Sequence, residues 1–150
     1  IERDLGLNVA AVPGAGAAGA MGAGMIAFFS AHLQMGIETV LDTVHFSDTI
    51  KNADLVFTGE GRLDAQSLRG KVVIGVAKRS QKEGVPVIAL VGGVDGDMKA
   101  AYDMGVTAIF SINRLPEDFS ISKNKSANNL AATAQDVLRI IKAFKEESNE

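Results

Sequence analysis

Residues 57–71, FTGEGRLDAQSLRGK, place charged side chains and glycines directly after an apolar run, and we call this stretch the charged loop. Glu60 and Asp64 stand four residues apart and can hold Mg²⁺ or accept a proton from an attacking hydroxyl. Arg62 and Lys71 can neutralise a phosphate or a carboxylate. Positioning, charge neutralisation, a metal and a base are what phosphoryl transfer needs. The competing interpretation is a salt-bridged loop with glycine turns.

The glycines of the charged loop fit the same chemistry. Gly59 and Gly61 lack side chains, so backbone amides can approach a ligand closely, and a helix that begins near Lys71 would direct further amides toward it. The loop is not a Walker A motif, because Ala65 and Val72 stand where that motif has glycine and Ser or Thr.

A second glycine pattern lies upstream. Gly14, Gly16 and Gly19 satisfy GxGxxG, with Asp42 as a candidate acidic residue for a ribose. A dinucleotide-binding oxidoreductase is therefore an alternative function. Pro13 beside the first glycine, and the richness of this segment in Ala and Gly, favour close helix packing instead.

The elements that must position these residues alternate along the chain. Short apolar runs that end in glycine are typical of strands buried on both faces of a parallel sheet. Between them, apolar residues recur at three- and four-residue intervals, as in helices that cover a sheet. The expected strands are 7–12, 54–59, 85–93 and 106–112, and the expected helices are 14–32, 36–45, 71–84, 97–105 and 126–145.

Two helices show a clear apolar face, and glycines mark helix ends. Gly84 and Gly105 are expected to cap the helices that precede them, and 115–125 is expected to be a polar, flexible loop. The buried face of helix 71–84 is predicted to hold Val72, Val73, Val76, Ala77 and Ser80, and that of helix 126–145 to hold Leu130, Ala134, Val137, Leu138, Ile141 and Phe144.

The strand–helix alternation predicts a right-handed parallel α/β unit with the charged loop at the carboxyl end of its first clear strand. Ligands of open parallel sheets bind at that end. The later strand ends offer Gly92, Gly93, Asp95, Asp97, Asn113 and Arg114 as further candidates. The expected strands are few for a complete parallel sheet, and the chain starts at Ile1. We therefore expect upstream sequence to supply the remaining strands.

Composition narrows the partners and the compartment. The net charge of -3 and pI near 5.4 leave no positive excess for a nucleic acid. The chain has no cysteine, which suits a reducing compartment such as the cytoplasm. The apolar stretch 9–29 consists mainly of Ala and Gly rather than larger apolar residues, so we expect no membrane span.

Several segments together resemble one family. GAGAAGAMGAG, ADLVFTGEGRLDAQSLRGK, GVAKRSQKEGVPVIALVGG, AIFSI and LAATAQDVLRII resemble, in order, the C-terminal part of type I bacterial glycerate kinases. The resemblance implies transfer of the ATP γ-phosphate to a hydroxyl of D-glycerate, with Mg²⁺ required. It implies a longer parent in which residues 53–150 complete a flavodoxin-like α/β domain with the missing N-terminal part. Residues 1–52 would belong to a second α/β domain and the junction.

The family motif carries over onto particular residues of this chain. Two positions depart from it: Ala20 stands where the family commonly has glycine, and Val73 where it commonly has proline. The matching positions are Gly59, Glu60, Gly61, Arg62, Asp64, Gln66, Ser67, Gly70 and Lys71 in the charged loop, and Gly14, Gly16 and Gly19 in the glycine-rich segment.

The roles expected from this carry-over are as follows. Asp64 would be the general base or a metal ligand, Glu60 would support Mg²⁺, and Arg62 and Lys71 would neutralise substrate carboxylate or transferring phosphate. A third hypothesis is a non-catalytic binding domain that kept the fold. The fragment alone is expected to be inactive for lack of the missing strands.

Overall fold

The computed structural model describes residues 1–147, which form two compact units. The first unit is Ile1–Thr39 and the second begins at Val40, so the units divide earlier along the chain than residue 53, where we expect the domain of the parent protein to begin. The ion pair between Asp42 and Arg79 (2.7 Å) ties the start of the second unit to its central helix.

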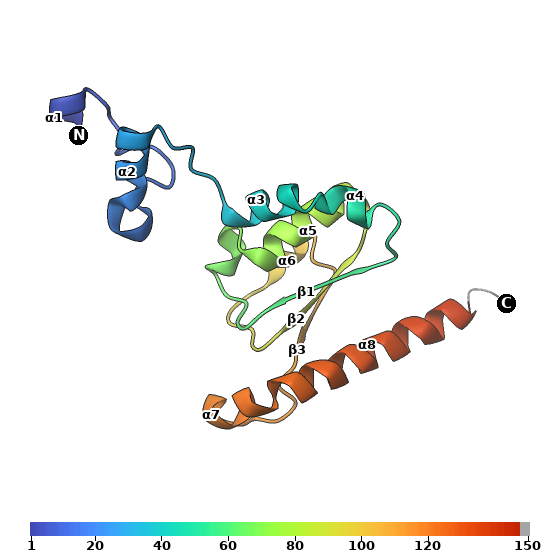
Figure 1. Ribbon diagram of the computed structural model, residues 1–150. Helices are drawn as coiled ribbons and strands as arrows, with labels where there is room; N and C mark the ends of the chain where they lie inside the picture. Colours follow the sequence, from blue (N-terminus) through green and yellow to red (C-terminus); the bar gives the residue numbers. More distant parts are fainter. Residues whose placement is uncertain (148–150) are drawn as a thin grey trace. The chain divides into compact units, whose positions relative to one another are not determined.

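The second unit is built on a parallel sheet of three strands in the order β1–β2–β3 (Figure 1). The strands are β1 (Val56–Glu60), β2 (Val87–Val91) and β3 (Ala108–Ser111), so the parallel α/β architecture expected from the sequence is confirmed. All five residues of β2 are buried, whereas burial alternates along β1. The central strand therefore has cover on both faces, and β1 is an edge.

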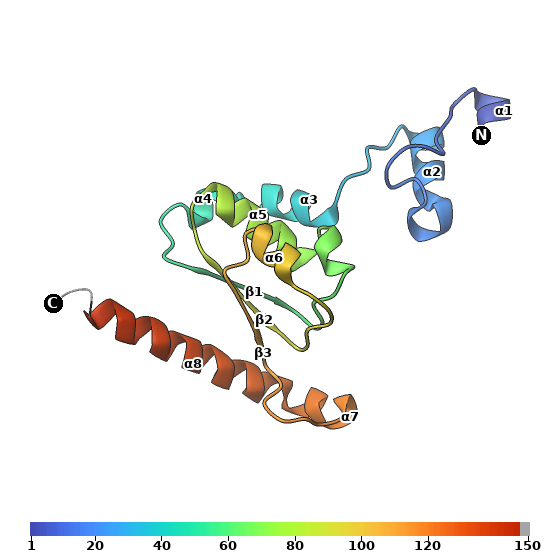
Figure 2. The same ribbon diagram turned by 180° about the vertical axis from the view of Figure 1, so that it is seen from behind.

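Helices cover the two faces of the sheet unequally. Four helices lie on one face: α3 (Gly36–Thr43), α4 (Phe46–Ile50), α5 (Val72–Lys82) and α6 (Lys99–Asp103) (Figures 1 and 2). The single long helix α8 (Ser126–Glu147) lies on the other face. Gly84 and Gly105 follow α5 and α6 with φ of +71° and +102°, which confirms them as helix-ending glycines.

The helix α5 buries one face against β1 and β2. Val73, Val76, Ala77 and Ser80 are buried as predicted, but Val72 is 48% exposed because it is the first residue of the helix. The Ser80 side chain is fully buried, and its hydroxyl has no hydrogen-bond partner among the described residues.

The helix α8 contacts the sheet along a narrower stripe than predicted. Val137 is buried with Ile88, Leu90 and Ile112 of the sheet side, and Ala134 and Ile141 pack around this cluster. The predicted stripe residues Leu130, Leu138 and Phe144 are exposed instead. Leu130 and Leu138 lie at the strand-end side of the helix, outside the cluster around Val137.

The segment 115–125 is more ordered than its predicted loop. A short helix α7 (Phe119–Ser122) and the 3₁₀ turn η2 (Lys123–Lys125) lead directly into α8. Lys125 forms an ion pair with Glu117 (2.6 Å) across this segment. The expectation of a loop is therefore wrong for residues 119–125, whose Ser and Asn residues continue helical turns, and holds for residues 115–118.

The first unit contains α1 (Glu2–Leu5) and α2 (Ala17–Phe29) and has no strand at 7–12. The predicted strand was wrong, since no second strand of this unit is present to pair with it. A kink divides α2, where Ala18, Gly19 and Ala20 adopt left-handed backbone angles. No helix of the described residues has the length and apolarity that crossing a bilayer requires.

Ala20, at φ +67°, occupies a conformation that suits glycine better than alanine. We expect Ala20→Gly to raise the free energy of unfolding by about 1 kcal/mol, because the left-handed penalty exceeds the entropy that glycine adds to the unfolded chain. Chemical denaturation measures the change. Ala27→Gly, in the regular part of α2, is the control and should lower stability by about 1 kcal/mol; equal losses in both variants would contradict the assigned backbone strain.

Candidate functional site

A cavity of about 1440 Å³ opens at the carboxyl ends of β1 and β2, and we call it the strand-end cavity. One wall consists of strand ends and the loops that follow them, and the other of α7, η2 and the first turns of α8. The lining residues are Phe57, Thr58, Gly59, Glu60, Gly61, Arg62, Leu90, Gly92, Gly93, Val94, Ile112, Asn113, Phe119, Ser122, Lys123, Ser126, Leu130, Ala134 and Leu138.

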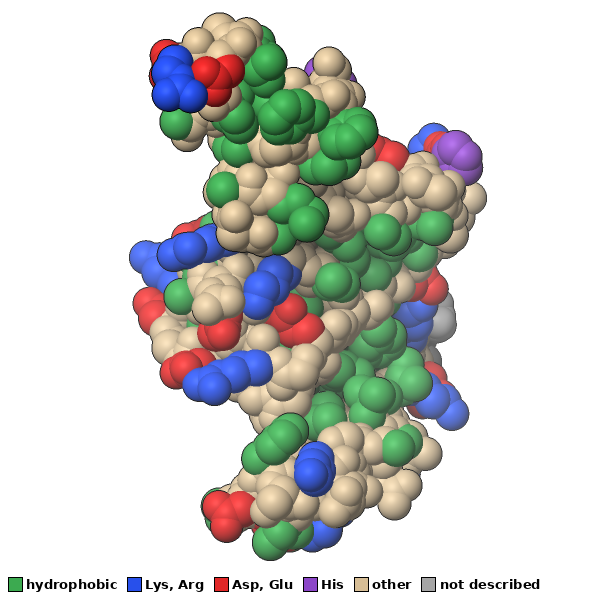
Figure 3. All heavy atoms as spheres, turned by 60° about the vertical axis from the view of Figure 1, so that its left-hand side comes forward, with side chains coloured by type: hydrophobic (Ala, Val, Ile, Leu, Met, Phe, Trp, Pro, Cys, Tyr) green, Lys and Arg blue, Asp and Glu red, His purple; other side chains and the backbone are tan. Residues whose placement is uncertain are grey.

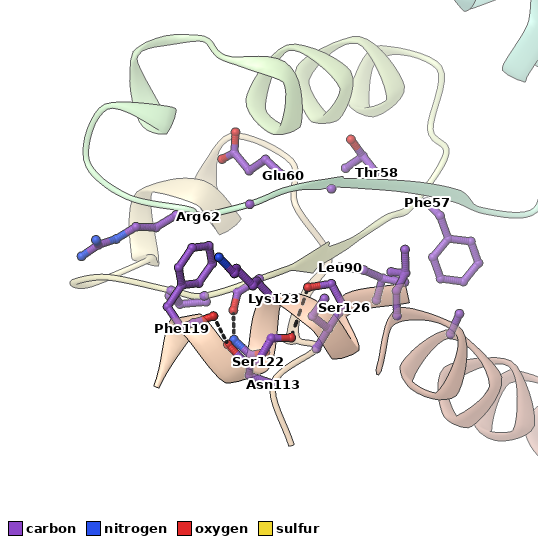
Figure 4. A pocket seen from close by; sticks show the side chains of 18 of the residues that line it. Phe57, Thr58, Glu60, Arg62, Leu90, Asn113, Phe119, Ser122, Lys123 and Ser126 are labelled. Carbon is purple, nitrogen blue, oxygen red and sulfur yellow. Dashed lines mark hydrogen bonds between the residues drawn. The ribbon is translucent and has the colours of Figure 1, made fainter. Parts of the chain in front are cut away.

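Strand alternation separates the side chains of β1. Thr58 and Glu60 point toward the η1–α5 segment, whereas Phe119 and Ser122 stand on the opposite side of the strand (Figure 4). Glu60 is therefore a lining residue of the cavity whose carboxylate is directed away from α7. Polar side chains near the end of β1 therefore lie on both faces of the sheet.

The Glu60 carboxylate is unusual among the charged groups of the loop. Its Oε1 atom is buried and has no hydrogen-bond partner among the described residues. The residue as a whole is half-buried, at the boundary between protein and open space. Buried carboxylate oxygens nearly always have a donor or a metal, so this atom is suited to a group that arrives from outside.

The Asp64 carboxylate, in contrast, is engaged by its own loop. Its Oδ1 accepts hydrogen bonds from the backbone N–H groups of Gln66 (2.8 Å) and Ser67 (3.1 Å). The Ser67 N–H, followed by the Gln66 N–H and the charge of Lys71, holds the pKa of Asp64 below its usual value. Asp64 is thus kept ionised inside a tight turn.

Ser67 anchors the same turn from within the protein. Its side chain is fully buried, and its Oγ accepts a hydrogen bond from the Asp64 N–H (3.3 Å). Its hydroxyl hydrogen lies within reach of two acceptors, the Arg62 carbonyl (3.3 Å) and Asp64 Oδ1 (3.4 Å). The 3₁₀ turn η1 (Ser67–Arg69) then ends at Gly70, whose φ is +95°.

The two basic residues of the loop lie in different places. Arg62 forms an ion pair with Asp95 in the loop after β2, so the sequence candidate Asp95 is brought to Arg62. Lys71 is the N-cap residue of α5, close enough to Asp64 to lower its pKa, and is not part of the cavity wall. Of the four predicted catalytic residues, Glu60 and Arg62 thus line the strand-end cavity, whereas Asp64 and Lys71 are not part of its wall.

The structure gives different reasons for the glycines of the loop. A Cβ on Gly59 would lie 2.3 Å from the Leu90 carbonyl oxygen, and one on Gly92 would lie 2.4 Å from the Gly61 oxygen. Close strand packing therefore requires both glycines. A Cβ on Gly61 would meet nothing within 4 Å, so this is the position with open space beside the backbone.

Sequence reasoning missed the wall that faces the strand ends. Phe119, Ser122 and Lys123 line the cavity from a segment predicted to be a loop, and Ser126 lines it from the start of the predicted last helix. Asn113, a weaker sequence candidate, also lines it and donates a hydrogen bond to the Gly92 carbonyl. The sequence signal for this wall was the run of Ser, Lys and Asn before the last helix, which has no distinctive spacing.

The glycine-rich segment belongs to the first unit. Gly16 lines a smaller hollow of about 410 Å³, and Gly14 and Gly19 have positive φ. No strand precedes these glycines, so the βα turn that a dinucleotide fingerprint requires is missing from this unit. This argues against the oxidoreductase alternative.

The described residues contain no group of three or more His, Asp or Glu side chains that could hold a metal by themselves. Mg²⁺ in kinases is usually held by one or two carboxylates together with substrate phosphates and water. The unpartnered Glu60 oxygen fits that requirement.

Two fully buried serines provide a matched test of the hydrogen bonds in the turn. We expect Ser67→Ala to lower the free energy of unfolding by about 1 to 3 kcal/mol, because buried partners lose their hydrogen bonds. Ser80→Ala should leave stability unchanged or raise it by about 1 kcal/mol, since it removes a hydroxyl without a partner. Urea denaturation measures the free energy of unfolding of both variants. Similar decreases in the two variants would show that the hydrogen bonds of Ser67 do not stabilise the protein.

Two glycines two residues apart test the packing of the loop. Gly59→Ala should destabilise the protein by about 1 to 3 kcal/mol, because the added methyl overlaps the Leu90 carbonyl. Gly61→Ala should change stability by less than about 0.5 kcal/mol. Thermal denaturation compares the two variants with the wild-type protein. A Gly59→Ala variant with wild-type stability would contradict the overlap with the Leu90 carbonyl.

Comparison with known proteins gives one consistent result. The model of the glycerate kinase family matches residues 1–142. Glycerate kinase of Haemophilus influenzae is 44% identical over 144 residues, 96% of this chain and 38% of that protein. Glycerate 2-kinase of Escherichia coli is 41% identical over 140 residues, 89% of this chain and 37% of that protein.

A solved structure agrees with these relatives. The crystal structure of a glycerate kinase 2 from Salmonella typhimurium LT2 superposes with a TM-score of 0.73 at 37% identity, over 97% of this chain and 37% of that one. The chain thus spans a little over a third of the length of the proteins that it matches. By family model, sequence and structure, the chain belongs to the glycerate kinase family.

Proposed function

We propose that this chain works as the C-terminal part of a longer kinase that transfers the γ-phosphate of ATP to a hydroxyl of D-glycerate. The observation that carries the proposal is the charged loop at the carboxyl end of β1, beside the strand-end cavity. Open parallel sheets bind ligands at that end. The names of the relatives supply the substrate.

The chain offers the charges that this reaction needs around one strand end. Arg62 and Lys71 neutralise the carboxylate of glycerate or the transferring phosphate, which spreads negative charge over its oxygens. Gly61, with open space beside its backbone, lets a ligand approach the loop. Gln66, Ser67 and Gly70 keep the loop in shape and contribute to binding mainly through the turn.

Mg²⁺ would be held mainly by the substrate phosphates. Of the two carboxylates that the sequence suggests as support, Asp64 is engaged by the turn, and Glu60 has an oxygen without a partner among the described residues. When bound, the ion supplies neutralisation of the phosphate charge. The side chains of the loop orient the substrates around it.

Upstream sequence of the same protein would complete the site and cover apolar surface. Phe57 (40%), Leu130 (44%), Leu138 (51%) and Phe119 (78%) are exposed at the cavity wall. Figure 3 shows hydrophobic side chains gathered on this face beside a group of charged ones. Exposed apolar surface of this kind usually receives a partner, so we expect the chain alone to be inactive. A reducing compartment such as the cytoplasm suits the full protein, since the chain has no cysteine.

ATP turnover by the full-length protein tests the proposal directly. We expect ADP formation that depends on D-glycerate and Mg²⁺, measured by a coupled assay, and none with the isolated chain. Other hydroxy acids and NAD reduction serve as controls. Turnover of NAD with a hydroxy acid, in the absence of ATP consumption, would favour the oxidoreductase alternative. Nucleotide binding without any turnover would favour a non-catalytic binding domain.

A further inference from the structure

The charged loop contains two carboxylates four residues apart whose surroundings differ in one decisive respect. Asp64 Oδ1 accepts two backbone hydrogen bonds, from Gln66 (2.8 Å) and Ser67 (3.1 Å). Glu60 Oε1 is enclosed by protein and accepts none among the described residues. From the sequence alone, either carboxylate could be a base or a metal ligand. The structure shows that their hydrogen-bonding environments differ.

The bonds of Asp64 are those of a side chain that builds a turn. Asp and Asn accept backbone N–H groups two and three residues ahead in this way, and either residue serves because only an sp² oxygen is needed. The turn in question fixes the buried Ser67, and Ser67 in turn holds the Arg62 carbonyl within 3.3 Å. Asp64 therefore acts on the site through the positions of its neighbours.

The position of Glu60 suits a different task. It is the last residue of β1, so rigid strand pairing with β2 places its backbone: the Gly92 N–H donates to the Glu60 carbonyl (3.1 Å). Its carboxylate points toward the η1–α5 segment, where Lys71 begins the helix (Figure 4). Its enclosed Oε1 has no donor among the described residues, and the residue as a whole is only half-buried, so a substrate hydroxyl has a side from which to approach the carboxylate.

We infer that Asp64 is a positioning residue that shapes the turn before α5, and that Glu60 is the catalytic carboxylate that accepts the proton of the substrate hydroxyl. This inference rests on the proposed kinase activity. In the step, the hydroxyl oxygen forms a bond to the γ-phosphorus while the bond from that phosphorus to the β–γ bridging oxygen breaks. The electrons of the broken bond leave with ADP, and the hydroxyl proton moves to Glu60.

Acid-to-amide variants of the full-length protein separate the two roles. For Glu60→Gln we expect kcat to fall by about 100-fold or more, with the melting temperature unchanged or raised. For Asp64→Asn we expect kcat within about fivefold of wild type, because the amide oxygen accepts the same two backbone hydrogen bonds. Asp103→Asn, at an exposed position of α6, is the matched control and should change neither kcat nor melting temperature.

A third substitution tests positioning by rescue. Asp64→Ala removes the acceptor, so we expect a lower melting temperature and a higher KM for the anionic substrates, both restored by Asn at the same position. Glu60→Gln should instead lower kcat with little change in KM. A residue with a purely structural role would not produce that separation of kcat from KM.

Several results would overturn the inference. A loss in Asp64→Asn as large as that in Glu60→Gln would place Asp64 among the reacting groups. Recovery of Glu60→Gln at high Mg²⁺ concentration would make Glu60 a metal ligand rather than a proton acceptor, and wild-type kcat in Glu60→Gln would exclude it from the reaction. If the wild-type protein phosphorylates another hydroxy acid, the proposed substrate is wrong, but the same comparison of variants still decides between the two carboxylates.

Discussion

The charged loop depends on one physical constraint, which is that the pairing of β1 with β2 continues past the ends of both strands. Beyond Glu60, the Leu63 N–H donates to the Gly93 carbonyl and the Asp95 N–H donates to the Leu63 carbonyl, each at 2.9 Å. Leu63 is fully buried between these bonds. Backbone hydrogen bonds thus hold the charged loop as an extension of the sheet. Its polar side chains are attached to this fixed backbone, which limits how far they can move.

The parts of this arrangement that follow from local pattern could be predicted from the sequence. Short apolar runs, two of which end in glycine, located the three strands, and the buried face of α5 followed from helical spacing except at its first residue. The strand–helix alternation predicted parallel strands with the charged loop at the carboxyl end of the first, and the structure confirms both. These predictions succeeded because the period of the apolar residues indicates which side chains are buried, and glycines indicate where the backbone turns.

Other parts depend on contacts that no local pattern encodes. The opposite surroundings of Glu60 and Asp64 arise from strand alternation and from a turn closed by Ser67, neither of which the residue types reveal. The predicted strand at 7–12 failed because a strand requires a partner, and the exposed Leu138 and Phe144 lie outside the buried stripe of α8, which is narrower than helical spacing alone predicted. The roles expected for Gly14, Gly16 and Gly19 stay predictions.

The two edge strands of the sheet matter if the polypeptide of such a protein is cut into two pieces. Within the described residues, β1 and β3 each pair with β2 alone, so each leaves one row of backbone donors and acceptors open. Open edges are templates for strand addition, either by the correct neighbour or by a copy of the same chain. A protein of this family that is cut upstream of β1 would therefore be a candidate for reassembly from two separate polypeptides, in which pairing with the added strand competes with self-association.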